Sequence, residues 1–363
     1  MLTRKGVYPY AYMDSPDKFK ETQLPSKEDF YNDLTKKHIT DKDFEFVNEM
    51  WKTFNLKNLG ELHDLYMETD TLLLADVFQN YRKIIFRHYE LDPIHFYTAP
   101  SLSWSAGLKF TNVKLEIPTD IDMLMFFDRG LCGGISMVSN HYAKANNKQL
   151  KEYYDPKTKE SYIMFVDANN LYGWAMSQTL PTGGFKWVRR LKTDVPAITN
   201  GDADFKSMQE WEQDIKNLKD DSDTGYMFEV DLDYPKNLHM DPMHDNFPLA
   251  PESFKIEKSM LSSYQKELGD NLDVTYESEK LCLTLKDKKK YICHYRNLKF
   301  YLKHGLKLKK IHKILQFDQS AWLKPYIDLN TQLRKEADNK FDEDQAKLMN
   351  NSFFGNFFFY MFS

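Results

Sequence analysis

One stretch, residues 161–178 (SYIMFVDANNLYGWAMSQ), constrains what the chain can fold into more than any other. Its four consecutive apolar residues at 163–166 predict a buried strand, and the Ala- and Met-containing segment after them is typical of a helix start. Asp167 would end that strand, where an unpaired carboxylate is costly and a divalent metal ion is a common partner. Tyr172 would then lie beside whatever the metal holds. An Asp167 that only caps the next helix is the alternative.

A second strong pattern covers residues 59–85, where apolar residues recur with the period of a helix. Tyr66 and Asp70 are four positions apart in this segment, so a helix places them on one face. That face can direct a phenol and a carboxylate towards one ligand, for example a metal-bound water. A buried tyrosine beside an aspartate on the helix surface explains the same pair without any chemistry.

Composition sets the class of protein. The chain has 363 residues, 42% of them hydrophobic, which predicts a folded protein with more than one domain. Its three cysteines are scattered and without zinc-finger spacing, so we expect a reduced, intracellular setting. No apolar run is long enough for a membrane span, and the N-terminus lacks the apolar core of a signal peptide, so no membrane partner is expected.

The net charge of −5 is unevenly distributed. Residues 286–313 contain eleven Lys and Arg against one acid, a local charge of +10 that leaves −15 for the remainder. Tyrosines and histidines lie among these cations, a mixture suited to phosphate backbones and ring stacking. Lys289, Lys290 and Arg296 are therefore candidate DNA contacts. The alternative is an ordinary solvated basic face.

A connection at a domain boundary is predicted over residues 91–112, which contain two prolines and a glycine. A helix is expected after it, over residues 120–128. Gly133 and Gly134 follow that helix and allow close approach to a phosphate strand, although a tight turn explains them equally well.

An insertion is predicted over residues 180–280, because prolines, glycines and an acidic loop-like stretch interrupt the regular patterns there. Within it we expect a helix near 208–218 and a strand at 226–232. The acids at 231 and 233, at the end of that strand, are a rival source of site carboxylates.

The last informative segment runs from residue 327 to residue 355 and is rich in helix formers to about residue 349. Lys335, Lys347, Asn351 and Phe354 could direct cation, amide and ring towards one groove, because 347, 351 and 354 are spaced for one helix face. Point positive charges suit a triphosphate and a ring suits its base. An amphipathic helix with exposed lysines and a buried Phe pair is the alternative.

Four of these segments, in this order, resemble the motifs of protein-primed family B DNA polymerases, a group that includes viral, phage and Maverick/Polinton-like replicases. Residues 167–172 (DANNLY) resemble motif A, DxxSLYP, and residues 347–355 (KLMNNSFFG) resemble motif B, KxxxNSxYG. Residues 66–70 (YMETD) resemble the third exonuclease motif, YxxxD, and residues 131–134 (LCGG) resemble the YxGG element. The ordered set covers most of the chain.

The resemblance implies phosphoryl transfer with two Mg²⁺ ions that activate a primer 3′-hydroxyl and stabilise the leaving pyrophosphate. It makes Asp167 a catalytic metal ligand and Asp70 a metal ligand of an exonuclease-like site beside Tyr66. It places Tyr172 under the incoming deoxyribose. Lys347, helped by Arg334 or Lys335, would hold the triphosphate.

The same resemblance places Asn351 and Phe354 beside the nascent base pair, and it makes Gly133, Gly134 and the basic tract DNA contacts. The implied partners are template-primer DNA, dNTPs and a terminal (priming) protein, in the nucleus or at a viral replication site. The implied fold is mixed α/β. It has four parts: the C-terminal part of an RNase H-like exonuclease domain (1–105), a first part of a palm (106–180), a terminal-protein-region-like insertion (181–318) and fingers (319–363).

The chain differs from the family pattern in lacking several of the acidic residues that the motifs of the family contain. No DTD of motif C occurs in the chain, and the exonuclease acids expected before Tyr66 are not visible. We therefore expect a polymerase fragment, truncated before motif C, whose activity alone is impaired or absent. The alternatives are a non-catalytic DNA- or nucleotide-binding remnant of a mobile-element or viral replicase and, resting on Tyr66 and Asp70 alone, a separate nuclease.

Overall fold

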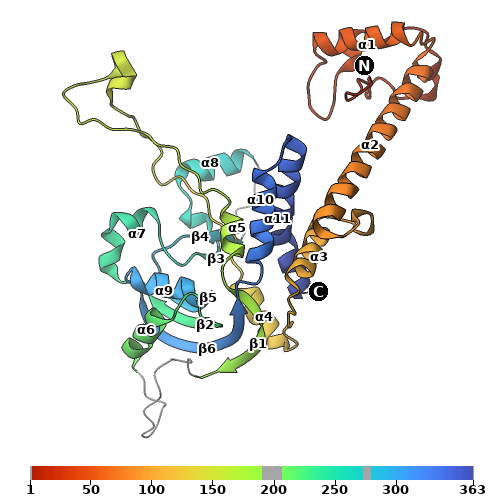
Figure 1. Ribbon diagram of the computed structural model, residues 1–363. Coiled ribbons are helices and arrows are strands. Elements are labelled where there is room, and N and C mark those ends of the chain that lie inside the picture. The colour runs from red at the N-terminus through yellow and green to blue at the C-terminus, as the bar shows by residue number, and fades with distance from the viewer. Residues whose placement is uncertain (1, 190–206, 273–278, 363) are drawn as a thin grey trace. The chain divides into compact units, whose positions relative to one another are not determined.

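The computed structural model describes residues 2–189, 207–272 and 279–362, with side chains up to residue 354. Residues 190–206 and 273–278 of the predicted insertion therefore lie outside the described residues. The chain is a mixed α/β protein of two compact units, Met1–Tyr97 and Thr98–Ser363 (Figure 1). Each unit has its own packed elements, and they are described separately below. Among the described residues, no helix has both the length and the apolar content needed to cross a membrane.

The first unit, over its described residues, is built from two helices and short 3-10 turns: η1 (Pro16–Lys20), η2 (Lys27–Phe30), α1 (Asp41–Thr53), α2 (Leu59–Tyr89) and η3 (Pro93–His95). The Asn58 side chain caps α2 by accepting a 2.9 Å hydrogen bond from the Glu61 N–H. Glu90 ends the helix in the left-handed region at φ 53°. The predicted long helix is therefore confirmed. Its first two turns close a small core with α1 and η2, formed by Phe30, Val47, Met50, Leu59 and Leu62.

The second unit contains a bundle of α3 (Ala99–Thr111), α10 (Lys324–Lys335) and α11 (Lys340–Phe362). The prediction of a connection over residues 91–112 is thus wrong for its second half. Pro100 lies in the first turn of α3, where the missing N–H removes no helical hydrogen bond, and Thr98 caps that turn. The predicted helix over 327–349 is two helices, separated by residues 336–339.

Phe353 of α11 fills the centre of this bundle and is fully buried. Its ring centroid lies 5.0 Å from that of Trp104 on α3 and 5.8 Å from that of Tyr326 on α10. Gly107 faces the ring so closely that a Cβ there would lie 2.5 Å from it, so α3 approaches only because residue 107 has no side chain. Ser103 donates to the Met349 carbonyl at 2.5 Å and ties α3 to α11.

A four-stranded antiparallel sheet forms the other half of the second unit, in the order β1 (Leu180–Val188), β6 (Lys307–Ser320), β2 (Thr224–Asp233), β5 (Lys288–His294). The predicted strand near 226–232 is β2, and it is the most buried of the four. Alternate residues of β2 pack on opposite sides, Phe228 and Val230 into one core and Met227 into the other. A core on each face of the sheet explains why this strand has little exposed surface.

Helices cover both faces of this sheet (Figure 1). The predicted helices are confirmed as α6 (Met208–Asn217) and α4 (Ile121–Gly130). Together with α9 (Tyr295–Lys303), α6 closes one core, while Met123, Phe126 and Phe127 of α4 close the other. A small second sheet pairs β3 (Glu252–Lys255) with β4 (Glu279–Cys282). The short helical elements are η4 (Lys148–Tyr153), α5 (Leu171–Met176), η5 (Lys236–Met240), α7 (Pro242–Asn246), η6 (Lys258–Met260) and α8 (Ser263–Asn271).

The predicted buried strand at 163–166 is not formed. These four residues are 66–94% exposed and belong to no strand of the described sheets. An apolar run becomes a buried strand only when a neighbouring strand supplies ladder hydrogen bonds and a layer covers it. Neither is present around this segment in the described part of the chain. Asp167 is therefore exposed, and it does not end a buried strand.

His294, at the end of β5, predicts an acid sensitivity of the second unit. Its ring packs against Tyr295 and Phe317, and its Nδ1 accepts from the Arg296 N–H at 3.4 Å. Burial lowers the pKa of His294 to about 4. In the unfolded chain this histidine has its ordinary pKa near 6.5, so the unfolded chain binds the proton more readily than the folded chain does. The stability that the neutral His294 contributes is therefore fully present above about pH 6.5 and is lost as the pH falls towards 4.

From pH 7.5 to about pH 5 we expect this histidine to remove about 2 kcal/mol from the free energy of unfolding. Urea denaturation at the two pH values measures the change. His294→Asn keeps a side chain that can cap the helix but that does not titrate. In this variant the free energy of unfolding should change little between these two pH values. An equal loss in His294→Asn and the parent chain would assign the sensitivity to other groups.

Candidate functional site

The residues singled out on α11 lie on one exposed stripe of that helix. Lys347, Asn351 and Phe354 are exposed, whereas Met349 and Phe353 on the opposite side are buried in the bundle. The spacing predicted from the sequence is confirmed, because the helix turns one face into the bundle and the face with these three residues outward. The alternative of a buried Phe pair is wrong for Phe354, which is 38% exposed.

The short helix α5 packs against α11 and brings Tyr172 to this stripe. The Tyr172 ring centroid lies 4.7 Å from that of Phe354, at an interplanar angle of 51°. Asn170 precedes the helix in the left-handed region at φ 50°, which an asparagine tolerates better than most residues. Its side chain lies where a Cβ of residue 173 would be, so Gly173 permits this tight entry into α5. The structure thus joins residues that are 182 positions apart into one aromatic pair.

The other predicted members of this site lie around the same bundle. Arg334, near the end of α10, is exposed and pairs with Glu343 at 3.2 Å. Lys335 ends α10 and is exposed. Asp167 precedes Tyr172 by five residues in an exposed, irregular segment. The described residues therefore provide cations, an amide and two rings on or near α11, with one carboxylate in the adjoining segment.

The side chains that could bind a metal ion are not clustered in the described part of the chain. Among the described residues, no three His, Cys, Asp or Glu side chains are gathered as ligands of one ion. Two Mg²⁺ ions need several carboxylate oxygens, and neither Asp167 nor Asp70 belongs to such a cluster. The residues present do not fit the implied two-metal site, so no chemical step is derived through it.

In the first unit, Tyr66 and Asp70 do share a face of α2, as predicted. Burial raises the pKa of Tyr66, and hydrogen bonds with Asp70 and Tyr10 raise it further. Tyr8 stacks on Tyr66 with centroids 4.9 Å apart, and its hydroxyl bonds His63 Nδ1 at 2.8 Å. The sequence does not predict that Tyr8 and Tyr10 contact Tyr66, because both lie in an irregular segment without a periodic pattern. The pair is part of a packed phenol cluster.

The predicted DNA contacts fall into two groups. Gly133 and Gly134 are exposed, and no atom lies within 4 Å of the position that a Cβ would take at either residue, so the fold itself does not require glycine there. Lys289 and Lys290 are exposed on β5. Arg296, in contrast, donates to Gln178 Oε1 at 3.4 Å and to Thr179 Oγ1 at 2.9 Å, so its guanidinium is engaged within the fold.

The basic tract as a whole is partly balanced by acids of β2. The β2–β6 register places three acids opposite three lysines: Glu229 faces Lys313, Asp231 faces Lys310 and Asp233 faces Lys307. Opposite charges on paired strands stabilise the sheet. Asp231 also accepts from His312 at 2.8 Å, and Asp233 pairs with Lys309 at 2.8 Å. Neighbouring side chains thus engage both of the acids, 231 and 233, that were the alternative source of site carboxylates.

No family model matches the sequence, and no curated protein is significantly similar to it. Solved structures of Phi29 DNA polymerase are similar to the chain. The complex with primer-template DNA and incoming nucleotide substrates has 16% identity and a TM-score of 0.41, covering 98% of this chain and 48% of that one. The orthorhombic crystal form has 16% identity and a TM-score of 0.43, with coverages of 97% and 47%.

The complex of Phi29 DNA polymerase with single-stranded DNA has 15% identity and a TM-score of 0.41, covering 97% of this chain and 46% of that one. The chain thus spans about half the length of the polymerase chains to which it is similar. Identities and TM-scores at this level assign no activity and no residue role to the chain.

Proposed function

We propose that the chain is a DNA polymerase-like protein that holds a nucleotide on the surface formed by α5 and the exposed stripe of α11. The observation that supports this most is the Tyr172–Phe354 pair, with Lys347 and Asn351 on the same stripe. A nucleotide needs a cation for its phosphates, a ring for its base or sugar and a hydrogen-bonding group for orientation. The bundle core under α11 fixes the positions of these groups.

Different residues of this surface would bind different parts of the nucleotide. Lys347 binds the phosphates as a point charge, and the exposed Lys335 adds positive potential at the end of α10, whereas Glu343 balances the charge of Arg334. The Tyr172 and Phe354 rings form a platform for the sugar and base, while the Asn351 amide can both donate and accept. Contacts to template-primer DNA through the exposed lysines of β5 would bind phosphate without reading sequence.

A non-catalytic DNA- or nucleotide-binding protein is the second candidate. It is favoured by the exposed position of Asp167 and by the lack, among the described residues, of a carboxylate cluster around it. Binding needs only the rings, cations and amide, whereas template-directed addition of dNTPs needs the carboxylates that hold Mg²⁺. Both candidates therefore share the α5–α11 surface, and they differ in whether Asp167 takes part in chemistry.

Titration calorimetry with dTTP tests the shared surface. Lys347→Ala should weaken dTTP binding about tenfold, because hydrogen bonds to charged groups contribute about 1.5–3 kcal/mol. Phe354→Ala should weaken it about fivefold through the lost ring contact. Lys324→Ala is the matched control, since it removes an exposed lysine that pairs with Asp328 elsewhere on α10. Equal affinities in Lys347→Ala and Lys324→Ala would exclude the proposed phosphate contact.

Primer extension in Mg²⁺ separates the two candidates. Incorporation of dNTPs by the parent chain, abolished in Asp167→Ala, would support the polymerase. Binding of dTTP and DNA without incorporation, unchanged in Asp167→Ala, would support the non-catalytic protein.

A further inference from the structure

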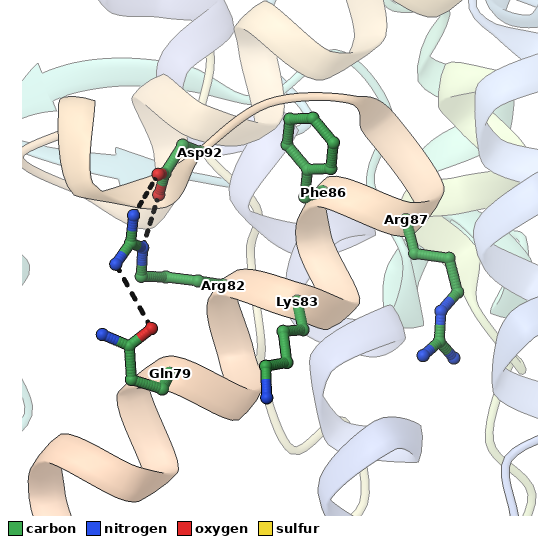
Figure 2. A pocket seen from close by; sticks show the side chains of 6 residues that line it. All are labelled: Gln79, Arg82, Lys83, Phe86, Arg87 and Asp92. Atoms are coloured by element: carbon green, nitrogen blue, oxygen red, sulfur yellow. Dashed lines mark hydrogen bonds and ion pairs between the residues drawn. The ribbon is translucent and has the colours of Figure 1, made fainter.

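The C-terminal half of α2 carries a charged pocket that the proposed function does not use. Its volume is about 350 Å³, and it is lined by Gln79, Arg82, Lys83, Phe86, Arg87 and Asp92 (Figure 2). The five helical residues follow the i, i+3, i+4, i+7, i+8 spacing of one helix face. We call this feature the α2 pocket. All of its residues belong to the first unit.

One side of the α2 pocket is a fixed ion pair. The Arg82 guanidinium donates to both oxygens of Asp92, at 2.9 Å from Nε and 2.5 Å from Nη2, and also to Gln79 Oε1 at 3.3 Å. The hydrogen bonds from Arg82 lower the pKa of Asp92 to about 2, so its carboxylate stays ionised. Asp92 also accepts from the Ile94 N–H at 3.1 Å. The pair therefore holds the segment after α2 against the helix and balances the charge of Arg82.

The other side carries two cations that have no ion-pair partner in the part of the chain that the structure describes. Lys83 and Arg87 are exposed and extend away from the ion pair (Figure 2). Within the described residues neither makes an ion pair or hydrogen bond, which leaves a net lining charge of +2. Two like charges four residues apart on a helix repel each other slightly. The helix dipole favours cations only in the last turn, so it accounts for Arg87 and not for Lys83.

An exposed aromatic ring completes the α2 pocket. Phe86 is 58% exposed, and in Figure 2 its ring stands between the ion pair and Arg87. An exposed ring and two cations of one helix, which make no ion pair among the described residues, offer stacking to one base of a strand that passes along the helix and binding to its adjacent phosphates. Bases in a duplex are already stacked on each other and cannot use such a ring. An unpaired base with its adjacent phosphates can.

We infer that the α2 pocket binds single-stranded nucleic acid, with Lys83 and Arg87 on the phosphates and Phe86 against a base. This contact is separate from the α5–α11 surface and does not depend on it. It would hold an unpaired strand whether or not the chain adds nucleotides.

Fluorescence anisotropy with a short labelled oligodeoxythymidylate, on the full chain at low salt, tests the inference. The variant Lys83→Ala/Arg87→Ala should bind about tenfold more weakly than the parent, and the slope of log K against log salt should fall by about 1.4, the loss of two phosphate contacts. Lys42→Ala/Lys52→Ala is the matched control, because it removes two exposed lysines from α1 of the same unit. Equal affinities in the two double variants would overturn the inference.

Phe86→Ala tests the base contact. It should weaken binding of oligodeoxythymidylate about fivefold or more and leave binding of a duplex of the same length unchanged. An equal loss on both nucleic acids would overturn the stacking role.

A binding assay with anionic phospholipid vesicles tests whether Lys83 and Arg87 bind the phosphates of lipids instead of those of nucleic acid. Binding to vesicles that Lys83→Ala/Arg87→Ala abolishes, without any effect on the oligonucleotide, would also overturn the inference. Lys347→Ala should leave the difference between the two double variants intact, so this test is separate from that of the α5–α11 surface.

Discussion

Phe353→Ala is expected to lower the free energy of unfolding of the second unit by about 3–5 kcal/mol, the range for removing a fully buried aromatic side chain. The Phe353 ring is the contact shared by all three helices of the bundle, and it also meets Trp322, at the entry to α10. Gly107 already lies against the ring, so α3 cannot approach further to close the cavity without moving its backbone. We therefore expect a loss in the upper part of this range.

Phe354→Ala is the matched control, because it changes the same residue type one position away on the exposed stripe of α11. Its effect should stay below about 1 kcal/mol, since the side chain is partly exposed and leaves no closed cavity. Urea denaturation followed by circular dichroism measures both variants. A loss for Phe354→Ala as large as that for Phe353→Ala would mean that α11 does not pack on the bundle as described. The two variants together separate the stability of the helix from the ligand contacts that its stripe is proposed to make.

The elements that the sequence predicts correctly are those whose pattern matches their own geometry. The apolar period of residues 59–85 indicates α2, and the short amphipathic runs indicate α4 and α6. The strand β2 is predictable because apolar residues at 226, 228, 230 and 232 alternate with other residues, so that they share one face of a strand. These elements form where local propensity and burial agree, so the pattern alone is sufficient.

The predictions fail where the outcome depends on partners far along the chain or on position within an element. The apolar run at 163–166 has strand composition but lacks a neighbouring strand, and a strand is not a local structure. Prolines between residues 91 and 112 favour a connection, yet Pro100 lies in the first turn of α3, where a proline removes no hydrogen bond. A proline's effect depends on its position in the helix, and the capping Thr98 is the signal that marks this helix start.

The candidate site shows the same division. The stripe of Lys347, Asn351 and Phe354 is predictable, because helical spacing alone places the three together. Its meeting with Tyr172 depends on the packing of α5 on α11, which the residues themselves do not encode locally. In the basic tract, charge counting does not distinguish the exposed lysines of β5 from Arg296, which is bound within the fold.

Another cation of that tract, Lys288, carries the second large effect. Its side chain is only 1% exposed, and its ammonium donates to Glu252 Oε1 at 2.6 Å and to Thr284 Oγ1 at 2.7 Å. The pair joins β3 of the small sheet to the start of β5. Glu252→Ala leaves the buried ammonium without its counter-charge, a situation that costs about 3–5 kcal/mol in proteins. We expect about 3 kcal/mol in denaturant unfolding, the lower end of that range, because Glu252 itself is partly exposed.

Lys288→Met is the informative partner variant. It removes the charge and keeps a long apolar side chain in the same space, so its effect should remain within about 1 kcal/mol, and Glu252→Ala added to it should lower stability little more. Burial lowers the pKa of Lys288, and loss of the Glu252 carboxylate should lower it further. The unfolded chain then holds the proton more tightly, so Glu252→Ala should regain stability as the pH rises towards the pKa of free lysine. A Glu252→Ala deficit that persists in the Lys288→Met background would show that the carboxylate acts through some other contact, such as its hydrogen bond from Thr284 at 2.7 Å.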